Sequence, residues 1–224
     1  MKLNTKAWLS LFALAVVMGL LIFLPAGTVR YWQAWAYLSV FMLVSFLTTL
    51  YLVRRDPALL ARRMSGGPAA EKRTSQKLIM LFVSVAFVAL LVVPALDRRF
   101  GWSSVPPAVV VLGDLLVAAG FYLIFLVYRE NTYTSATIEV AEGQKVVSTG
   151  PYAVVRHPMY AGGLLYLAAT PLALGSYWGL LAFAALLPFL VWRLLDEEQF
   201  LARDLPGYRE YRQRIRYRLV PFVW

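Results

Sequence analysis

The chain has 224 residues, of which 60% are hydrophobic and 15% charged, and its formal net charge is +10. A soluble domain carries about 25% charged residues, and the apolar residues here gather in long runs, so we expect an integral membrane protein. The absence of cysteine excludes disulfides and thiolate ligands, and the single histidine excludes a multi-histidine metal site. No basic segment resembles a nucleic-acid recognition module, so we assign the positive charge to the cytoplasmic face of a lipid bilayer.

Four apolar runs fill the first part of the chain, and each is about long enough to cross ~30 Å of hydrocarbon at 1.5 Å per residue. They cover residues 7–24, 32–53, 78–96 and 105–127. The first run has the basic start of a signal peptide, but a second apolar run follows it at once, so we interpret it as a retained helix. We interpret the basic segment 62–75, which contains a Gly-Gly-Pro sequence, as a solvated cytoplasmic loop.

The last apolar stretch, residues 160–195, is interrupted near Gly175 and predicts a hairpin of two short helices. Pro171 and Pro188 are expected to kink these helices, and kinked helices at membrane depth usually line a cavity or pack on protein. The predicted fold is therefore all-α, with about six transmembrane helices that end in a short helical hairpin.

The basic residues favour an orientation with both termini in the cytoplasm. Eighteen of them fall in the four segments that are then inside, which are 1–6, 54–77, 128–159 and 196–224. Only Arg30, Arg98 and Arg99 fall outside, and an excess of Lys and Arg marks the cytoplasmic side. We divide the chain into a four-helix membrane region (1–127) and a second region (128–224) with a polar connector, the hairpin and an interfacial C-terminal segment.

The candidate chemistry lies in this second region. The hairpin's second helix returns to the side where the first begins, so His157 and Glu197 are expected to be neighbours although 40 residues separate them. Ionisable groups cluster at the hairpin mouth, namely Arg156, His157, Tyr160, Arg193, Glu197 and Glu198. Charges at such depth are costly and indicate a function, although Arg193 and Glu197, four residues apart, also fit an ordinary helix-surface ion pair. Asp114, inside the fourth run, either marks a substrate path or lies near the outer headgroups.

A longer pattern surrounds this cluster. It comprises Gly150-Pro151-Tyr152, Arg156-His157-Pro158-Met159-Tyr160, Gly162, Glu197-Glu198, Tyr208, Tyr211 and Pro221. The pattern resembles the isoprenylcysteine carboxyl methyltransferase family, and phospholipid methyltransferases are similar in the same region. The resemblance implies a membrane enzyme that uses S-adenosyl-L-methionine as its cofactor, and it covers roughly residues 128–224.

The resemblance also implies a set of site residues. The adenosyl part of the cofactor would be lined by the backbone of Gln144, Lys145, Val146 and Val147, and the wall continued by Tyr152, His157, Pro158, Met159 and Tyr160. Thr137 stands where the family usually has a glutamine. Glu197 or Glu198 would hold the amino or hydroxyl groups of the cofactor, and Arg193 matches an arginine that the family associates with substrate.

The charges of the cluster are compatible with this cofactor, which is cationic at sulfur and amine and anionic at its carboxylate. Methyl transfer is an in-line displacement without a covalent enzyme intermediate, so positioning and desolvation can carry much of the rate. His157 would be a general base for an amine or alcohol acceptor. For a carboxylate or thiolate it would be a hydrogen-bonding wall residue, which is the role we favour.

The methyl acceptor stays open. The family name suggests a prenylated cysteine carboxylate, while a phospholipid amine, a small thiol or another lipid are alternatives. A second hypothesis is an NADPH-dependent oxidoreductase similar to sterol reductases, which carry a similar RHPxY hairpin. A third is a non-catalytic membrane protein that keeps the hairpin. The pair Glu197-Glu198 and the Gly-Pro-Tyr element favour the methyltransferase.

Overall fold

The computed structural model describes residues 2–71 and 73–224, and within these ranges the regular structure is entirely helical. The α-helices are α1 (Leu3–Ala26), α2 (Trp32–Arg55), α3 (Pro57–Met64), α4 (Thr74–Phe100), α5 (Pro107–Glu130), α6 (Pro158–Ala173), α7 (Gly179–Asp204) and α8 (Tyr208–Arg214). Two short 3-10 helices, η1 (Pro68–Ala70) and η2 (Gly150–Ala153), lie in the connections. The predicted all-α fold is confirmed.

In the described part of the chain, five helices are long and apolar enough to cross a membrane, namely α1, α2, α4, α5 and α7. The sixth helix, α6, has 16 residues, which is about 24 Å at 1.5 Å per residue, so it falls short of the hydrocarbon thickness. The prediction of a hairpin of two short helices is wrong for α7, which has 26 residues and continues to Asp204. The polar segment after Asp196 stays helical because Glu, Gln, Leu, Ala and Arg are good helix formers in water as well.

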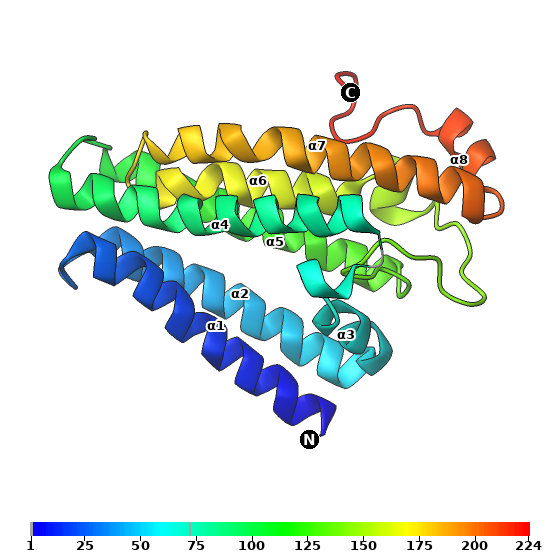
Figure 1. Cartoon of the computed structure of the whole chain (residues 1–224), viewed down its shortest axis with the longest axis horizontal. Coiled ribbons are helices and arrows are strands. Elements are labelled where there is room, and N and C mark those ends of the chain that lie inside the picture. Colours follow the sequence, from blue (N-terminus) through cyan, green and yellow to red (C-terminus); the bar gives the residue numbers. More distant parts are fainter. Residues whose placement is uncertain (1, 72) are drawn as a thin grey trace.

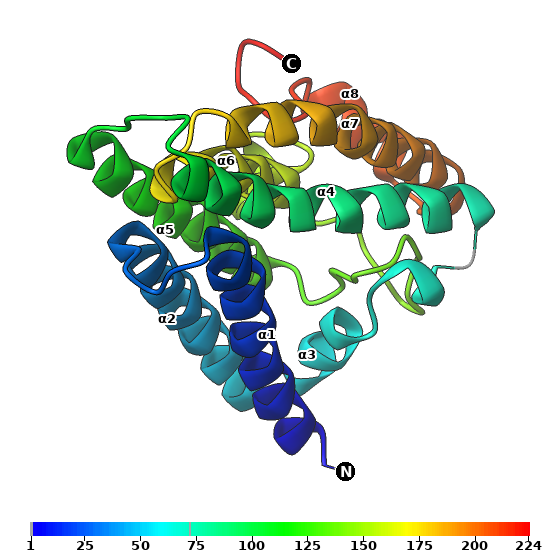
Figure 2. The same cartoon turned by 60° about the vertical axis from the view of Figure 1, so that its left-hand side comes forward.

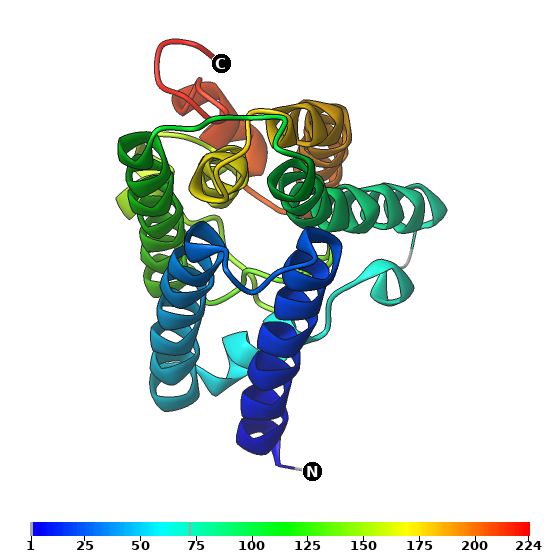
Figure 3. The ribbon, with the colours of Figure 1, turned by 90° about the vertical axis from the view of Figure 1, so that its left-hand side faces the viewer.

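Helices α4, α5, α6 and α7 lie side by side in a bundle, and α1 and α2 pair beneath it (Figure 1). Figures 2 and 3 show that α1 and α2 approach the bundle at one end and diverge from it toward the other, where α3 lies. The largest buried cluster joins these layers near the first end, with Met18, Ile22, Tyr37, Leu91, Val117 and Ala173 among its members.

Successive helices among α1, α2, α4, α5, α6 and α7 run in opposite directions. The connections between them therefore lie at two opposite ends of the molecule. At the turn end, where α1–α2, α4–α5 and α6–α7 are joined, the Tyr31 hydroxyl donates to the carbonyl of Leu174. At the connector end, Arg62 donates to the carbonyl of Thr132 in the segment that links α5 to α6. The segments predicted to lie inside from their basic residues are therefore grouped at the connector end. Arg30, Arg98 and Arg99 lie at the turn end.

Asp97 holds the turn end together. Its side chain is buried, and its Oδ1 accepts from the backbone N–H of Ser103 (2.6 Å). Its Oδ2 accepts from the hydroxyls of Ser103 (2.6 Å) and Ser176. One carboxylate thereby ties the α4–α5 loop to the α6–α7 turn, which fixes the hairpin against the bundle.

Glycines set the distance between α5 and α6. A Cβ on Gly120 would lie 2.6 Å from the carbonyl oxygen of Gly162, and a Cβ on Gly162 would lie 2.7 Å from that of Gly120. The two backbones therefore pack in direct contact, as small residues allow between membrane helices. This contact places the start of α6, and with it the RHPxY element, against the connector end of α5.

Replacing Asp97 with alanine should destabilise the protein by about 3 kcal/mol, because the buried Ser176 hydroxyl and two part-buried donors of Ser103 lose their charged acceptor. Thermal unfolding in detergent, followed by circular dichroism, measures the effect. Asp204→Asn is the matched control, since Asp204 forms an ion pair with the exposed Arg203. Equal melting temperatures for the two variants would contradict the role given to Asp97.

Candidate active site

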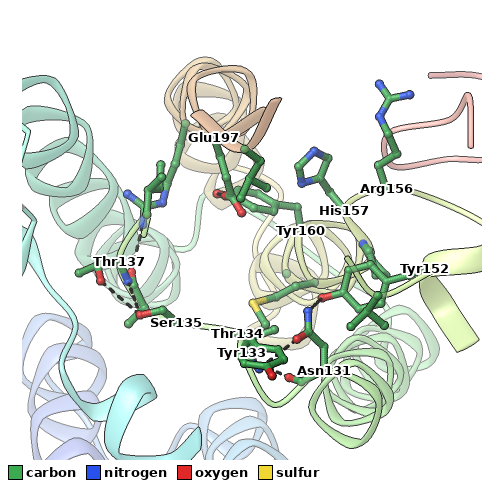
Figure 4. Close-up of a pocket in the computed structure, with 18 of the residues that line it drawn as sticks. Asn131, Tyr133, Thr134, Ser135, Thr137, Tyr152, Arg156, His157, Tyr160 and Glu197 are labelled. Atoms are coloured by element: carbon green, nitrogen blue, oxygen red, sulfur yellow. Dashed lines mark hydrogen bonds between the residues drawn. The ribbon is translucent and has the colours of Figure 1, made fainter. Parts of the chain in front are cut away.

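A cavity of about 340 Å³ opens at the connector end, between α4, α5, α6, α7, α8 and the connector. Its volume falls in the range of sites for small ligands and cofactors. The inner part is lined mainly by apolar side chains, including Met80, Val83, Ile124, Leu164, Leu167 and Leu190. The outer part is lined by polar groups of the connector and the hairpin mouth, several of which surround the cavity in Figure 4.

The connector is held over the cavity by its own side chains. Asn131 donates to the hydroxyl of Tyr152 (3.1 Å), and its Oδ1 accepts from the backbone N–H of Tyr133 (3.0 Å). The Ser135 hydroxyl donates to Glu139 (3.0 Å) and lies 3.2 Å from the Thr137 hydroxyl (Figure 4). Gln144 accepts from the backbone N–H of Ala141 (2.9 Å) and closes a turn there. An irregular segment is thus ordered without a strand among its described residues.

The buried carboxylate of Glu198 organises the hairpin mouth. Its Oε1 accepts from Arg156 Nε (2.6 Å) and lies 3.2 Å from His157 Nε2. Its Oε2 accepts from Arg218 Nε (2.9 Å), and Arg156 also donates to the carbonyls of Ile215 and Arg216. Only 2% of Glu198 is exposed, so its charge is met by protein groups rather than by water.

The neighbouring Glu197 has a different environment. Its carboxylate lines the cavity and accepts from the hydroxyl of Tyr160 (2.6 Å) (Figure 4). Adjacent residues on a helix point about 100° apart, which separates the two carboxylates. Glu197 therefore faces the cavity, while Glu198 turns to the C-terminal segment and is absent from the cavity lining.

Arg193 lines the cavity from one turn before Glu197. Its ion pair is with Glu71 (2.8 Å), and it donates to the side chain of Gln76 (2.7 Å) and the carbonyl of Ala136 (3.0 Å). The prediction that segment 62–75 is a solvated loop is wrong for Glu71, the partner of Arg193. Glu71, inside that segment, is 4% exposed, because a buried guanidinium needs an anionic partner.

Burial changes the titration of the tyrosines at this end. Desolvation raises the pKa of Tyr211 to about 12. It also raises the pKa of Tyr152 and of Tyr208 above the ordinary value, and at Tyr208 the charges of Glu198 and Glu197 add to the effect. All three hydroxyls line the cavity region as neutral groups at physiological pH, and that of Tyr211 donates to the carbonyl of Tyr152 (2.8 Å).

Comparison with known proteins places this arrangement in a family. The phospholipid methyltransferase family matches residues 108–206, which run from α5 to α7. Protein-S-isoprenylcysteine O-methyltransferase B of Arabidopsis thaliana is 30% identical over 156 residues, covering 65% of this chain and 73% of that protein. The chain belongs to the isoprenylcysteine carboxyl methyltransferase family. Membership assigns it to the methyltransferases, and the expected resemblance is confirmed.

A Delta(14)-sterol reductase of Mus musculus is also similar, with 36% identity over 93 residues. These residues make up 39% of this chain and 22% of the reductase, so the chain spans about a fifth of that protein's length.

The structure brings most of the predicted site residues of this family member to one cavity. The lining includes Arg193, Glu197, His157, Thr137, Gln144, Lys145, Val146, Val147, Tyr152, Pro158, Met159 and Tyr160. Glu198 lies behind this wall, in the ion-pair cluster with Arg156 and Arg218. Asp114 lies apart from the cavity, on the buried face of α5 toward the turn end.

Several lining residues escaped the sequence analysis. Arg63, from α3, donates to the carbonyl of Ser135 (2.6 Å) and lines the cavity, as do Asn131 and Ser135 itself. Glu71 and Gln76 reach the site through Arg193. In the sequence, the sign of their role was an acidic residue, Glu71, inside a basic segment. The role itself depends on the packing of that segment against α7, which the sequence does not show.

Replacing Glu198 with alanine should lower the free energy of unfolding by about 3 kcal/mol, because the buried Arg156 loses its counter-charge. Chemical or thermal unfolding in detergent measures this loss. Glu210→Ala, on the exposed face of α8, removes the same charge and should leave stability nearly unchanged. A stable Glu198→Ala variant would show that the cluster does not hold the site together.

Proposed function

We propose that the chain transfers the methyl group of S-adenosyl-L-methionine to a lipidic or membrane-associated small acceptor. The observation that carries the proposal is the cavity itself, which joins a polar outer part with charged groups of both signs to an apolar part between membrane helices. A water-soluble donor and an acceptor with an apolar tail require these two environments side by side. The family assignment supports the methyl chemistry.

The residues present fit a cationic donor. Glu197 faces the cavity and accepts one hydrogen bond from the neutral Tyr160, so its charge is available to a ligand. The backbone of Gln144, Lys145 and Val146 lines the outer part, where a nucleoside is expected. When bound, the donor supplies an electrophilic methyl carbon on a positively charged sulfur. We propose that Glu197 and the connector hold it, and that Arg193 orients the acceptor.

His157 is proposed as a wall residue. Its Nε2 lies 3.2 Å from the buried carboxylate of Glu198, and the ring stands edge-on to Tyr160 at 5.6 Å between centroids. An imidazole engaged with a carboxylate inside the protein wall is held in place, which favours positioning over proton transfer to the acceptor. The acceptor nucleophile would then be one that needs no base, such as a carboxylate or thiolate, with a phospholipid amine as the alternative.

The site is proposed to face the cytoplasm. The cavity opens at the connector end, which carries eighteen basic residues in the predicted inside segments. The C-terminal segment is proposed to lie at the membrane surface beside it. Phe222 is 88% and Val223 78% exposed, and basic residues precede them, as in interfacial segments that meet anionic lipid.

The detergent-purified protein should bind S-adenosylhomocysteine, the product that the donor leaves. Glu197→Ala should weaken binding about 10- to 100-fold, since a charge-assisted hydrogen bond contributes about 1.5–3 kcal/mol, and His157→Ala should also weaken it. Isothermal titration calorimetry measures both, with Glu210→Ala as control. Binding of NADPH without S-adenosylhomocysteine would support the reductase-like alternative, and binding of neither would support a non-catalytic protein.

The methyl acceptor can be identified by the labelled methyl group that it receives. Incubating the protein with S-adenosylmethionine that carries a labelled methyl group, together with lipid extracts, should transfer the label to one lipid class. Base-labile label indicates a carboxyl methyl ester, and base-stable label indicates a methylated amine or thiol. The absence of transfer to any fraction, in protein that binds the donor, would contradict a lipidic acceptor.

A further inference from the structure

Arg193 and Glu197 stand one turn apart on α7, and both line the cavity. Opposite charges at this spacing on a helix attract each other, and the attraction is stronger away from water. If they paired, the guanidinium would neutralise the carboxylate that faces the cavity. That carboxylate would then be less able to bind a cationic ligand.

The structure provides Arg193 with a different anionic partner. Glu71, which lies between η1 and α4, places its carboxylate oxygen 2.8 Å from Arg193 Nη2. Gln76 accepts from Nη1 at 2.7 Å, and the Ala136 carbonyl accepts from Nη2 at 3.0 Å. Arg193, Glu71 and Gln76 are 8%, 4% and 0% exposed, so these contacts are made away from bulk water.

The segment that carries Glu71 is itself fastened to α7. Gln76 donates to the carboxylate of Asp196, and Arg73 donates to the same oxygen at 2.8 Å. The amide of Gln76 thus bridges Arg193 and Asp196, three residues apart on α7. Glu71 reaches Arg193 because this bridge fixes the start of α4 against the hairpin.

Arg193 attracts Glu197 from a distance, but the ion pair of Arg193 is with Glu71. Among residues 2–71 and 73–224, no basic nitrogen forms an ion pair with the Glu197 carboxylate, which accepts from the neutral hydroxyl of Tyr160. Of the pair Glu197-Glu198, only Glu197 lines the cavity.

We propose that Glu71 is a positioning residue that keeps Arg193 away from Glu197, so that the Glu197 carboxylate stays available to the cationic methyl donor. The inference rests on the proposed function, because the donor is the ligand that needs this charge. Glu71 acts through Arg193 and does not touch the ligand. The membrane region thereby contributes a residue on which donor affinity depends, although the donor-binding residues themselves follow α5.

The test is a double-mutant cycle on the binding of S-adenosylmethionine, which carries the sulfonium charge, measured by calorimetry with the detergent-purified protein. Glu71→Gln keeps the volume of the side chain but removes its charge, so Arg193 is released toward Glu197 and affinity should fall about tenfold. In the double variant Glu71→Gln with Arg193→Gln, no guanidinium remains to neutralise Glu197. Its affinity should return to within about threefold of the unaltered protein.

Recovery in the double variant is the result that a merely structural role would not give, because two damaging changes to a packed cluster would add. Unchanged affinity in Glu71→Gln, or further loss in the double variant, would overturn the proposal. Glu142→Gln, on the exposed part of the connector, is the charge-matched control, and thermal unfolding of each variant checks that it is folded.

A failure of the proposed function gives a different pattern. If the unaltered protein does not bind S-adenosylmethionine, both the proposed function and this inference are overturned. If it binds and loses affinity in Glu197→Ala but not in Glu71→Gln, the donor site stands and only the role of Glu71 is overturned.

Discussion

The organisation of the connector end depends on the buried carboxylate of Glu198. Two arginines and a histidine converge on it from the start of α6 and from the C-terminal segment. A buried charge is tolerated only when partners replace the water it has lost, so these segments cannot separate without exposing an unpaired ion. The wall that carries His157, Pro158 and Tyr160 is fixed as a result, and the C-terminal segment closes behind it.

A second set of pairings distributes the remaining charges. Arg193 forms its ion pair with Glu71, while the Glu197 carboxylate lines the cavity and accepts from the Tyr160 hydroxyl. The site therefore holds a guanidinium and a carboxylate one turn apart that do not form an ion pair with each other. This arrangement suits the proposed reaction, in which the donor and the acceptor are bound by different groups.

Much of the molecule could be predicted from its residues. The apolar runs predicted five of the candidate spans because hydrophobic length is a local property. The RHPxY element with the Glu-Glu pair led to the family and to a set of site residues of which only Glu198 lies outside the cavity lining. The helix end at Asp204 was missed, because polarity marks where a helix leaves the membrane rather than where its hydrogen bonds stop. The burial of Glu71 was not predicted, because it depends on Arg193, a partner distant in sequence.

The sequence by itself predicted a helical membrane protein and placed its candidate chemistry around the last hairpin, since hydropathy and motif spacing act over short stretches of chain. The tertiary structure decided which of two adjacent glutamates faces the cavity and which partner holds Arg193. Those choices rest on the rotation of α7 and on the approach of the α3–α4 segment to it. Both are set by packing among helices far apart in sequence, so they become visible only when the chain is folded.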